Sequence, residues 1–274
     1  MALDTWQRDH DVTPSNALGA LVCGFPRGGT TLAAELLRQH PDLAGGFEGG
    51  FLLATHPRAF PSLEPFGAMA LKGWQLTGKQ LDSVCDVDTW AELYEGLRHA
   101  SPLVHKGERL PRWVIDKTPR YMPLLPEIMD KTPGVPVLVI VRDPRAVLWS
   151  WAKRAKEQST ETWIRNSLDS ACARYCSFGR GWRNAVRLKG AESLSLVHYE
   201  RLCLDPIDTA RRLFEALSLE FDPSYLSFRS RWPNVYGAEV QQTFIREYET
   251  GFSSQTCQRI LDLTAAFPEF RFQP

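Results

Sequence analysis

A glycine-rich segment near the amino terminus has residue types suited to binding a phosphate group. Gly28 and Gly29 allow the backbone to approach an anion closely, and Arg27 supplies a positive charge. Thr30 and Thr31 add hydroxyl donors where a helix is expected to begin. The free N–H groups and the positive end of that helix would face the same anion. The segment therefore predicts a phosphate cradle, for which a plain glycine-rich turn is the alternative interpretation.

The spacing of this cradle differs from that of nucleoside-triphosphate-binding loops. Gly24 and Gly29 match the two glycines of the pattern G-x-x-x-x-G-K-[ST], but Thr30 stands where the lysine belongs. The nearest cation is Arg27, further back in the loop. Because the missing lysine contacts the β- and γ-phosphates, the change disfavours phosphoryl transfer and suits a shorter, diphosphate-like anion.

A second candidate anion site follows the most hydrophobic run of the sequence. Arg142 comes directly after this run, and Pro144 suits the first position of a helix. Ser150 lies nearly two helical turns into that helix and could point back toward Arg142. A guanidinium and a hydroxyl together suit a second phosphate. Without the first cradle, a surface pair of Arg142 and Asp143 with an incidental serine would explain this pattern equally well.

Strand and helix patterns alternate around these motifs. Short apolar runs predict strands at Leu18–Phe25, Leu43–Gly45, Trp113–Asp116, Pro136–Val141 and Leu194–His198. Helical patterns follow the glycine loop and cover Arg120–Asp130, Pro144–Glu157, Thr160–Leu188 and Ile207–Leu217. The alternation predicts an α/β fold of three layers with a central parallel sheet of about five strands.

The length of 274 residues favours one domain over two small ones. We find no linker, internal repeat or low-complexity tract, so residues 1–274 are expected to form a single domain. Residues 1–17 are expected to form a polar arm. The stretch 51–112, helical around Asp88–Ala100, and the segment 224–274 are expected to shape a substrate pocket above the carboxyl ends of the strands.

Charge and apolar patterning argue against several classes of protein. The 32 Lys and Arg residues balance 32 Asp and Glu residues, which disfavours a general nucleic-acid binder. The first residues lack the apolar stretch of a signal peptide, and the longest apolar run, Val137–Val141, is too short to span a membrane. Scattered cysteines without a Cys-x-x-Cys pair indicate reduced thiols, no metal site and a cytoplasmic location.

Four motifs, in this order, resemble those of the PAPS-dependent sulfotransferases, where PAPS is 3′-phosphoadenosine 5′-phosphosulfate. They are Pro26–Leu32, Asp116–Pro119, Val141–Arg145 with Ser150, and Tyr199–Leu202. The resemblance covers most of residues 20–223. It implies a P-loop-NTPase-like sulfotransferase architecture, PAPS as the donor substrate and no required metal. The family more often has serine at the position of Gly28, and glycine there keeps the backbone contacts.

The resemblance also implies which residues hold the donor. The 5′-phosphosulfate would be held by Arg27, Gly28, Gly29, Thr30, Thr31 and Leu32. Arg142 and Ser150 would hold the 3′-phosphate, with Tyr199 beside the nucleotide. A packed aromatic at the end of a strand is the other interpretation of Tyr199. The family's basic C-terminal loop has only weak counterparts here, at Arg229, Arg231 and Gly237.

Sulfuryl transfer to an alcohol requires proton removal, in-line attack and stabilisation of the departing bridging oxygen. Arg27 and Lys117 are the residues we expect to stabilise the sulfuryl and bridging oxygens. Cytosolic family members use a histidine two residues after this lysine, where this sequence has Pro119. Other members, including tyrosylprotein sulfotransferases, use a glutamate shortly after the His-Pro that follows the first helix. Glu48 occupies that position after His40.

Glu48 is therefore the predicted general base, acting with Lys117 and Arg27. Asp116, which is expected to support the loop, and His105, which lies among charged residues, are the fallback bases. An exposed loop acid and a solvated loop lysine are the non-catalytic interpretations of Glu48 and Lys117.

Two other functions fit the sequence less well. A kinase with a degenerate phosphate loop would need a magnesium-binding carboxylate, for which Asp116 is a weak match. A non-catalytic nucleotide-binding protein would keep the cradle and lack the transfer. For a sulfotransferase, the acceptor is a small-molecule, carbohydrate or peptidyl hydroxyl, or an amine, and no motif selects among them or sets the oligomeric state. Trp74 and Trp90 either line the acceptor pocket or pack in the core.

Overall fold

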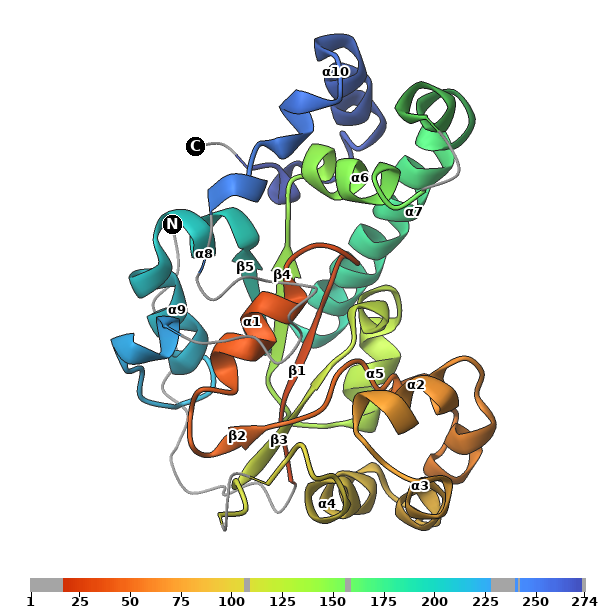
Figure 1. Ribbon diagram of the computed structural model, residues 1–274, viewed down its shortest axis with the longest axis vertical. Coiled ribbons are helices and arrows are strands. Elements are labelled where there is room, and N and C mark those ends of the chain that lie inside the picture. Colours follow the sequence, from red (N-terminus) through yellow and green to blue (C-terminus); the bar gives the residue numbers. More distant parts are fainter. Residues whose placement is uncertain (1–16, 106–108, 156–158, 228–239, 241, 273–274) are drawn as a thin grey trace.

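The computed structural model describes residues 17–105, 109–155, 159–227, 240 and 242–272, and in these ranges the strands form one sheet (Figure 1). All pairs are parallel, in the order β2-β3-β1-β4-β5. The strands are β1 (Leu18–Gly24), β2 (Leu43–Ala44), β3 (Trp113–Lys117), β4 (Val137–Val141) and β5 (Leu194–His198). The predicted α/β fold with a central parallel sheet is confirmed.

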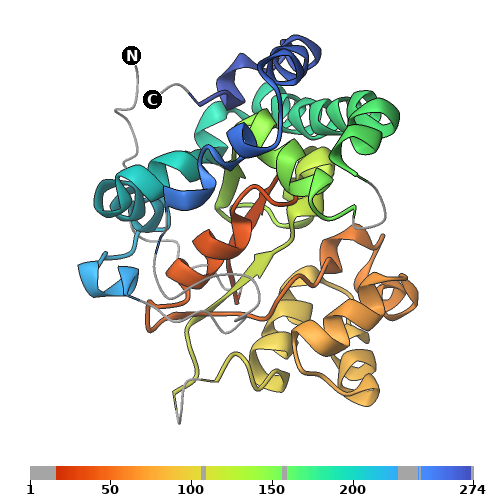
Figure 2. The same ribbon diagram turned by 45° about the horizontal axis from the view of Figure 1, so that its top comes forward.

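Helices cover both faces of this sheet. The α-helices of the described residues are α1 (Thr30–Leu37), α2 (Phe66–Gly73), α3 (Gly78–Cys85), α4 (Trp90–Ala100), α5 (Leu125–Lys131), α6 (Pro144–Ala152), α7 (Thr160–Lys189), α8 (Tyr199–Leu204), α9 (Pro206–Glu215) and α10 (Ser254–Leu263). Short 3₁₀ helices include Phe51–Leu53, Pro119–Leu124, Gln242–Phe244 and Glu247–Thr250. Two views show α2 to α4 at one end of the molecule and α10 beside α6 and α7 at the other (Figures 1 and 2).

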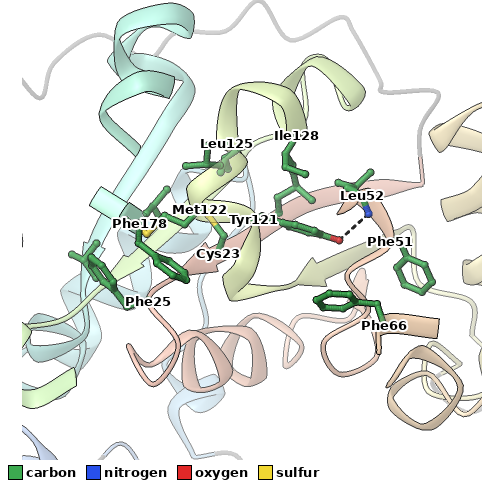
Figure 3. Close-up of a cluster of buried hydrophobic side chains, with 14 of the residues drawn as sticks. Cys23, Phe25, Phe51, Leu52, Phe66, Tyr121, Met122, Leu125, Ile128 and Phe178 are labelled. Carbon is green, nitrogen blue, oxygen red and sulfur yellow. Dashed lines mark hydrogen bonds between the residues drawn. The ribbon is translucent and has the colours of Figure 1, made fainter. Parts of the chain in front are cut away.

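The alternation of side chains along the strands divides the core into two clusters. Leu21 and Cys23 of β1 belong to the cluster covered by α5, α6 and α7, part of which Figure 3 shows. Ala20 and Val22 belong to the cluster covered by α1, α8 and α9. Strands buried on both faces are typical of parallel sheets, which explains the continuous apolar runs in the sequence.

The turn between β1 and α1 requires glycine at two positions. Gly24 has φ 149° and a Cβ there would lie 1.9 Å from the carbonyl oxygen of Ile140. Gly29 has φ 98° and a Cβ there would lie 2.3 Å from the ring of Tyr199. These contacts allow the loop to lie directly against β4 and the start of α8, and α1 then begins at Thr30.

Several predicted helices differ from those observed. The helix expected at Arg120–Asp130 is divided into the 3₁₀ helix Pro119–Leu124 and α5, because Pro123 and Pro126 lack amide hydrogens. The helix expected to reach Glu157 ends at Ala152. Helices α2 and α3 lie in the insertion 51–112, which was expected to be helical but with a helix placed only around Asp88–Ala100, whereas α8 and α10 were not expected. The capping box of Thr77 and Gln80, which starts α3, is a sequence signal that would have identified that helix.

None of the helices in the described ranges is long and apolar enough to cross a membrane. All six cysteines are described, and each is a free thiol.

Candidate active site

The carboxyl ends of β1 and β4 bring the two predicted anion sites together. Arg27 Nε donates to Ser150 Oγ at 3.2 Å, and Arg142 Nη1 donates to the backbone carbonyl of Arg27 at 3.1 Å. The two strands are hydrogen-bonded neighbours, so the loops that follow them meet at the same edge of the sheet. Residues that are 123 positions apart in the sequence therefore contact each other.

A cavity of about 70 Å³ lies at this contact. Its lining includes Arg27, Gly29, Arg142, Ser150, Tyr199 and Phe244. In the same measure one water molecule needs roughly 10–15 Å³, so the cavity has room for a phosphate group but not for a whole nucleoside. Lys153 and Glu247 also line the cavity and pair with each other, and the two arginines and the Ser150 hydroxyl supply the donors that a phosphate requires.

Arg142 is held in place from several sides. Its side chain is buried, its Nη2 donates to the carbonyl of Phe244, and its Cζ lies 4.5 Å from the centre of the Tyr199 ring. The hydroxyl of Tyr175 donates to the Arg142 carbonyl at 2.9 Å. No carboxylate among the described residues forms an ion pair with Arg142, and its Nε has no hydrogen-bond partner there. This buried positive charge makes the cavity favourable for an anion.

Lys117 and Glu48 form a second group beside the same loop. Lys117 Nζ donates to Glu48 Oε1 at 3.0 Å and to Thr31 Oγ1 at 3.2 Å, and it lies 3.7 Å from the centre of the Phe47 ring. The Lys117 side chain is fully buried, whereas that of Glu48 is 26% exposed. Burial lowers the pKa of Lys117 to about 8, although the carboxylate of Glu48 acts in the opposite direction. The pair thus combines a buried cation with a carboxylate that solvent can reach.

The start of α1 joins the two groups. Arg27 precedes the helix and contacts Ser150, while Thr31 in the first turn contacts Lys117. Gly29 is the N-cap residue, and because it has no side chain it makes no capping hydrogen bond to the N–H groups of the first turn. Thr30 and Leu32 are buried, and the side chain of Leu32 packs in the core. A ligand at this loop can therefore contact only the backbone of Leu32.

Arg27, which was predicted at the sulfuryl group, donates through its Nε to Ser150, which was predicted at the 3′-phosphate. Tyr199 lines the cavity and is also a packed aromatic, since only 3% of its surface is exposed. The Tyr199 ring therefore packs in the core and also forms part of the cavity wall.

Arg38 and Gly73 hold the backbone that leads into Glu48. The buried Arg38 guanidinium pairs with Glu35 in α1 and donates to the carbonyl of Gly46. The amide of Phe47 donates to the carbonyl of Gly73 at 2.7 Å. The position of Glu48 thus depends on contacts with α1 and α2.

The two fallback bases have other environments. Asp116 is fully buried, and burial raises its pKa. Its carboxylate accepts hydrogen bonds from Tyr94, Tyr121 and Thr118. His105 is exposed, and its Nε2 lies 3.1 Å from the carbonyl of His99 in the insertion. Neither residue has the combination of solvent contact and proximity to Lys117 that Glu48 has.

Sequence reasoning missed several residues at the cavity. Lys153 lies one helical turn after Ser150 and pairs with Glu247, so helical spacing could have indicated it. Phe244 contributes a backbone carbonyl from a segment without any pattern. Trp74 is fully buried in the core, which is one of the two interpretations that its sequence position allowed, and Trp90 packs near Lys131. The weak candidates Arg229, Arg231 and Gly237 lie outside the described residues.

This chain is similar to known sulfotransferases in sequence. Residues 20–223 match the family model described as "Sulfotransferase family". The nodulation protein NoeE of Sinorhizobium fredii is 26% identical over 234 residues, which cover 80% of this chain and 53% of that protein. The chain spans about half the length of the curated relatives it matches.

Solved structures share the fold. The sulfotransferase domain of the olefin synthase from Synechococcus PCC 7002 aligns with a TM-score of 0.67 and 19% identity, covering 99% of this chain and 100% of that one. Mouse sulfotransferase SULT7A1, complexed with PAP, aligns with a TM-score of 0.53 and 11% identity, covering 92% and 86%. Since the family model spans well over half of its residues, this chain belongs to the sulfotransferase family.

Proposed function

We propose that this protein transfers a sulfuryl group from PAPS to a hydroxyl or amine acceptor, with Glu48 as the general base. The observation that carries the proposal is the pair of cationic groups on either side of one glycine loop. Arg142 lies at one end, beside Ser150, and Lys117 lies at the other, beside Glu48. A donor with anionic groups at both ends of a nucleoside suits such a loop.

In this proposal Arg142 and Ser150 bind the 3′-phosphate of the donor. Arg27 and the loop Gly28 to Leu32 bind the 5′-phosphosulfate, with the N–H groups at the start of α1 donating to it and the Arg27 guanidinium stabilising the sulfuryl group together with Lys117. The mouse sulfotransferase of similar fold is a complex with PAP, the product that PAPS leaves after transfer, and this supports the choice of donor. The buried charge of Arg142 without a carboxylate partner in the described residues supports it further.

The chemistry follows from the Lys117–Glu48 pair. Glu48 accepts the proton of the acceptor while the acceptor atom forms a bond to sulfur. The bond from sulfur to the bridging oxygen breaks, and its electron pair stays on the 5′-phosphate of PAP. Lys117 stabilises the charge that develops on this oxygen, because an ammonium held in a buried site stabilises such charge more strongly than one in water. With a pKa of about 8, Lys117 is mostly protonated at pH 7.

The same proposal covers the organisation and surroundings of the chain. We treat residues 1–274 as one domain, in which the insertion 51–112 and the segment 224–274 flank the acceptor site. The free cysteines fit a reducing compartment such as the cytoplasm. Positioning and fixed cations carry the catalysis, so we expect no requirement for a metal.

Ligand binding followed by transfer tests this function. Thermal shift should show stabilisation by PAP without metal, and incubation with ³⁵S-labelled PAPS and a panel of phenols, sugars, amines and peptides should label at least one acceptor. Stabilisation by ATP with magnesium, and none by PAP, would instead support a kinase. PAP binding without transfer to any acceptor or to water would support a non-catalytic nucleotide-binding protein.

A further inference from the structure

Asp116, at the end of β3, is the centre of a buried hydrogen-bond network. The hydroxyls of Tyr94 and Tyr121 each donate to Asp116 Oδ2 at 2.6 Å, and Thr118 Oγ1 donates to Asp116 Oδ1 at 2.9 Å. All four side chains are fully buried. Buried carboxylates are tolerated when their oxygens are satisfied in this way.

Two of these donors also accept hydrogen bonds from the segment that follows Glu48. The amide of Gly50 donates to Thr118 Oγ1 at 3.0 Å. The amide of Leu52 donates to the hydroxyl of Tyr121 at 3.2 Å, a bond that Figure 3 shows. A hydroxyl has one proton to give and lone pairs to receive, so each can serve both partners at once. Two parallel links therefore connect Asp116 to the Glu48 segment.

The neighbour of Asp116 on the strand is Lys117, whose ammonium contacts Glu48 itself. The end of β3 thus holds Lys117, and the residues beside it bind the backbone of Gly50 and Leu52, two and four residues after Glu48. The segment has little freedom elsewhere, because Gly50 has φ 73° and a Cβ there would lie 2.3 Å from the ring of Phe66. The 3.0 Å contact of Lys117 with Glu48 depends on where this segment sits.

We propose that Asp116, Thr118 and Tyr121 form a positioning clamp that sets the distance between Glu48 and Lys117. The inference rests on the proposed function, in which these two residues perform the proton and charge transfer. The three clamp residues touch neither donor nor acceptor in this proposal, so they act through the pair that they position. Burial raises the pKa of Tyr121 well above its usual range and keeps its hydroxyl proton available for Asp116.

Tyr94 offers a matched control. Its hydroxyl binds the same oxygen of Asp116 at the same distance as that of Tyr121, and both rings are fully buried. Among the described contacts, however, it accepts no amide from the segment Gly50–Leu52. Tyr94→Phe and Tyr121→Phe therefore remove the same group from the same carboxylate, and only the second breaks a link to the Glu48 segment.

Steady-state kinetics of the full chain should separate the two variants. With PAPS and a labelled acceptor, or with water as acceptor, Tyr121→Phe should lower kcat roughly tenfold to a hundredfold while KM for PAPS stays within about twofold. Thr118→Val should act in the same direction, and Tyr94→Phe should retain most of the wild-type kcat. Equal losses in Tyr94→Phe and Tyr121→Phe, or no loss in the latter, would overturn the clamp.

A second measurement does not depend on turnover. Hydrogen–deuterium exchange should be faster at Gly50–Leu52 in Tyr121→Phe than in Tyr94→Phe. Because Glu48 raises the pKa of Lys117, NMR titration of labelled lysine should give a lower Lys117 pKa in Tyr121→Phe. If Lys117 titrates in Tyr121→Phe as it does in the wild type, the clamp is refuted, whether or not the wild type transfers a sulfuryl group. If the wild type transfers no sulfuryl group but the Lys117 titration shifts, only the proposed function is refuted.

Discussion

Lys117 Nζ and Glu48 Oε1 lie 3.0 Å apart although 69 positions separate the two residues in the sequence. The ammonium is fully buried and the carboxylate is partly exposed. In the proposed mechanism this asymmetry lets the carboxylate meet an acceptor that enters from solvent, while the ammonium stays beside Thr31 in the first turn of α1. The following predictions test that division of roles and the donor site beside it.

Glu48→Gln should lower kcat by about 10²–10⁴, because the amide cannot accept the acceptor's proton. The affinity for PAP, measured by calorimetry, should change little, since Glu48 lies away from the Arg142 cavity. Glu64→Gln is the control: it removes one carboxylate from an exposed position, and it should leave kcat unchanged. Turnover of Glu48→Gln at the wild-type rate would remove Glu48 from the mechanism.

Raising the pH through about 8 should lower kcat, because Lys117 then loses the proton that makes it a cation. Stability should respond in the opposite direction. The unfolded chain keeps this lysine protonated up to a pKa of about 10.4, so between pH 8 and 10.4 it binds more protons than the folded chain. The free energy of unfolding of the wild type, relative to Lys117→Met, should therefore rise over this interval in denaturant titrations. If the difference in unfolding free energy between the wild type and Lys117→Met did not change with pH over this interval, Lys117 would have an ordinary pKa.

Arg142→Ala should weaken binding of PAP roughly tenfold to a hundredfold, the effect of losing hydrogen bonds to a charged group. Adenosine 5′-phosphosulfate lacks the 3′-phosphate, so its affinity should stay nearly constant. Arg112→Ala is the matched control, because Arg112 also stacks on an aromatic ring but precedes β3. Equal losses for both nucleotides would contradict the assignment of Arg142 to the 3′-phosphate.

Gly29→Ala should destabilise the protein by about 1–3 kcal/mol and weaken PAP binding, since the new methyl group meets the Tyr199 ring in an unfavourable backbone conformation. Gly134→Ala is the control, because Gly134 also has a positive φ, of 75°, but a Cβ there would have no neighbouring atom within 4 Å. That control should lose stability from backbone strain alone and keep its PAP affinity. Calorimetric unfolding with and without PAP measures both effects, and similar behaviour of the two variants would show that contact with Tyr199 is unimportant.

The local patterns of the sequence were sufficient for the parallel sheet and for the phosphate loop. Apolar runs such as Pro136–Val141 and glycines at Gly24 and Gly29 act over a few residues, so their structural meaning is local. The order of the four motifs, from Pro26–Leu32 to Tyr199–Leu202, also indicated the family through their resemblance to sulfotransferase motifs. Helix ends were less predictable, since Pro123 and Pro126 changed a helix that periodicity alone had favoured.

Only the tertiary structure decided which of these residues touch. Neither the contact of Arg27 with Ser150 nor the carbonyl of Phe244 on Arg142 follows from spacing, because both depend on which strands are neighbours and on a C-terminal segment without pattern. The links from Asp116 to the Glu48 segment likewise join β3 to a loop that local propensity leaves undefined. Side-chain types and short-range periodicity are properties of the chain alone, whereas distances between its remote parts are set by packing of the whole core.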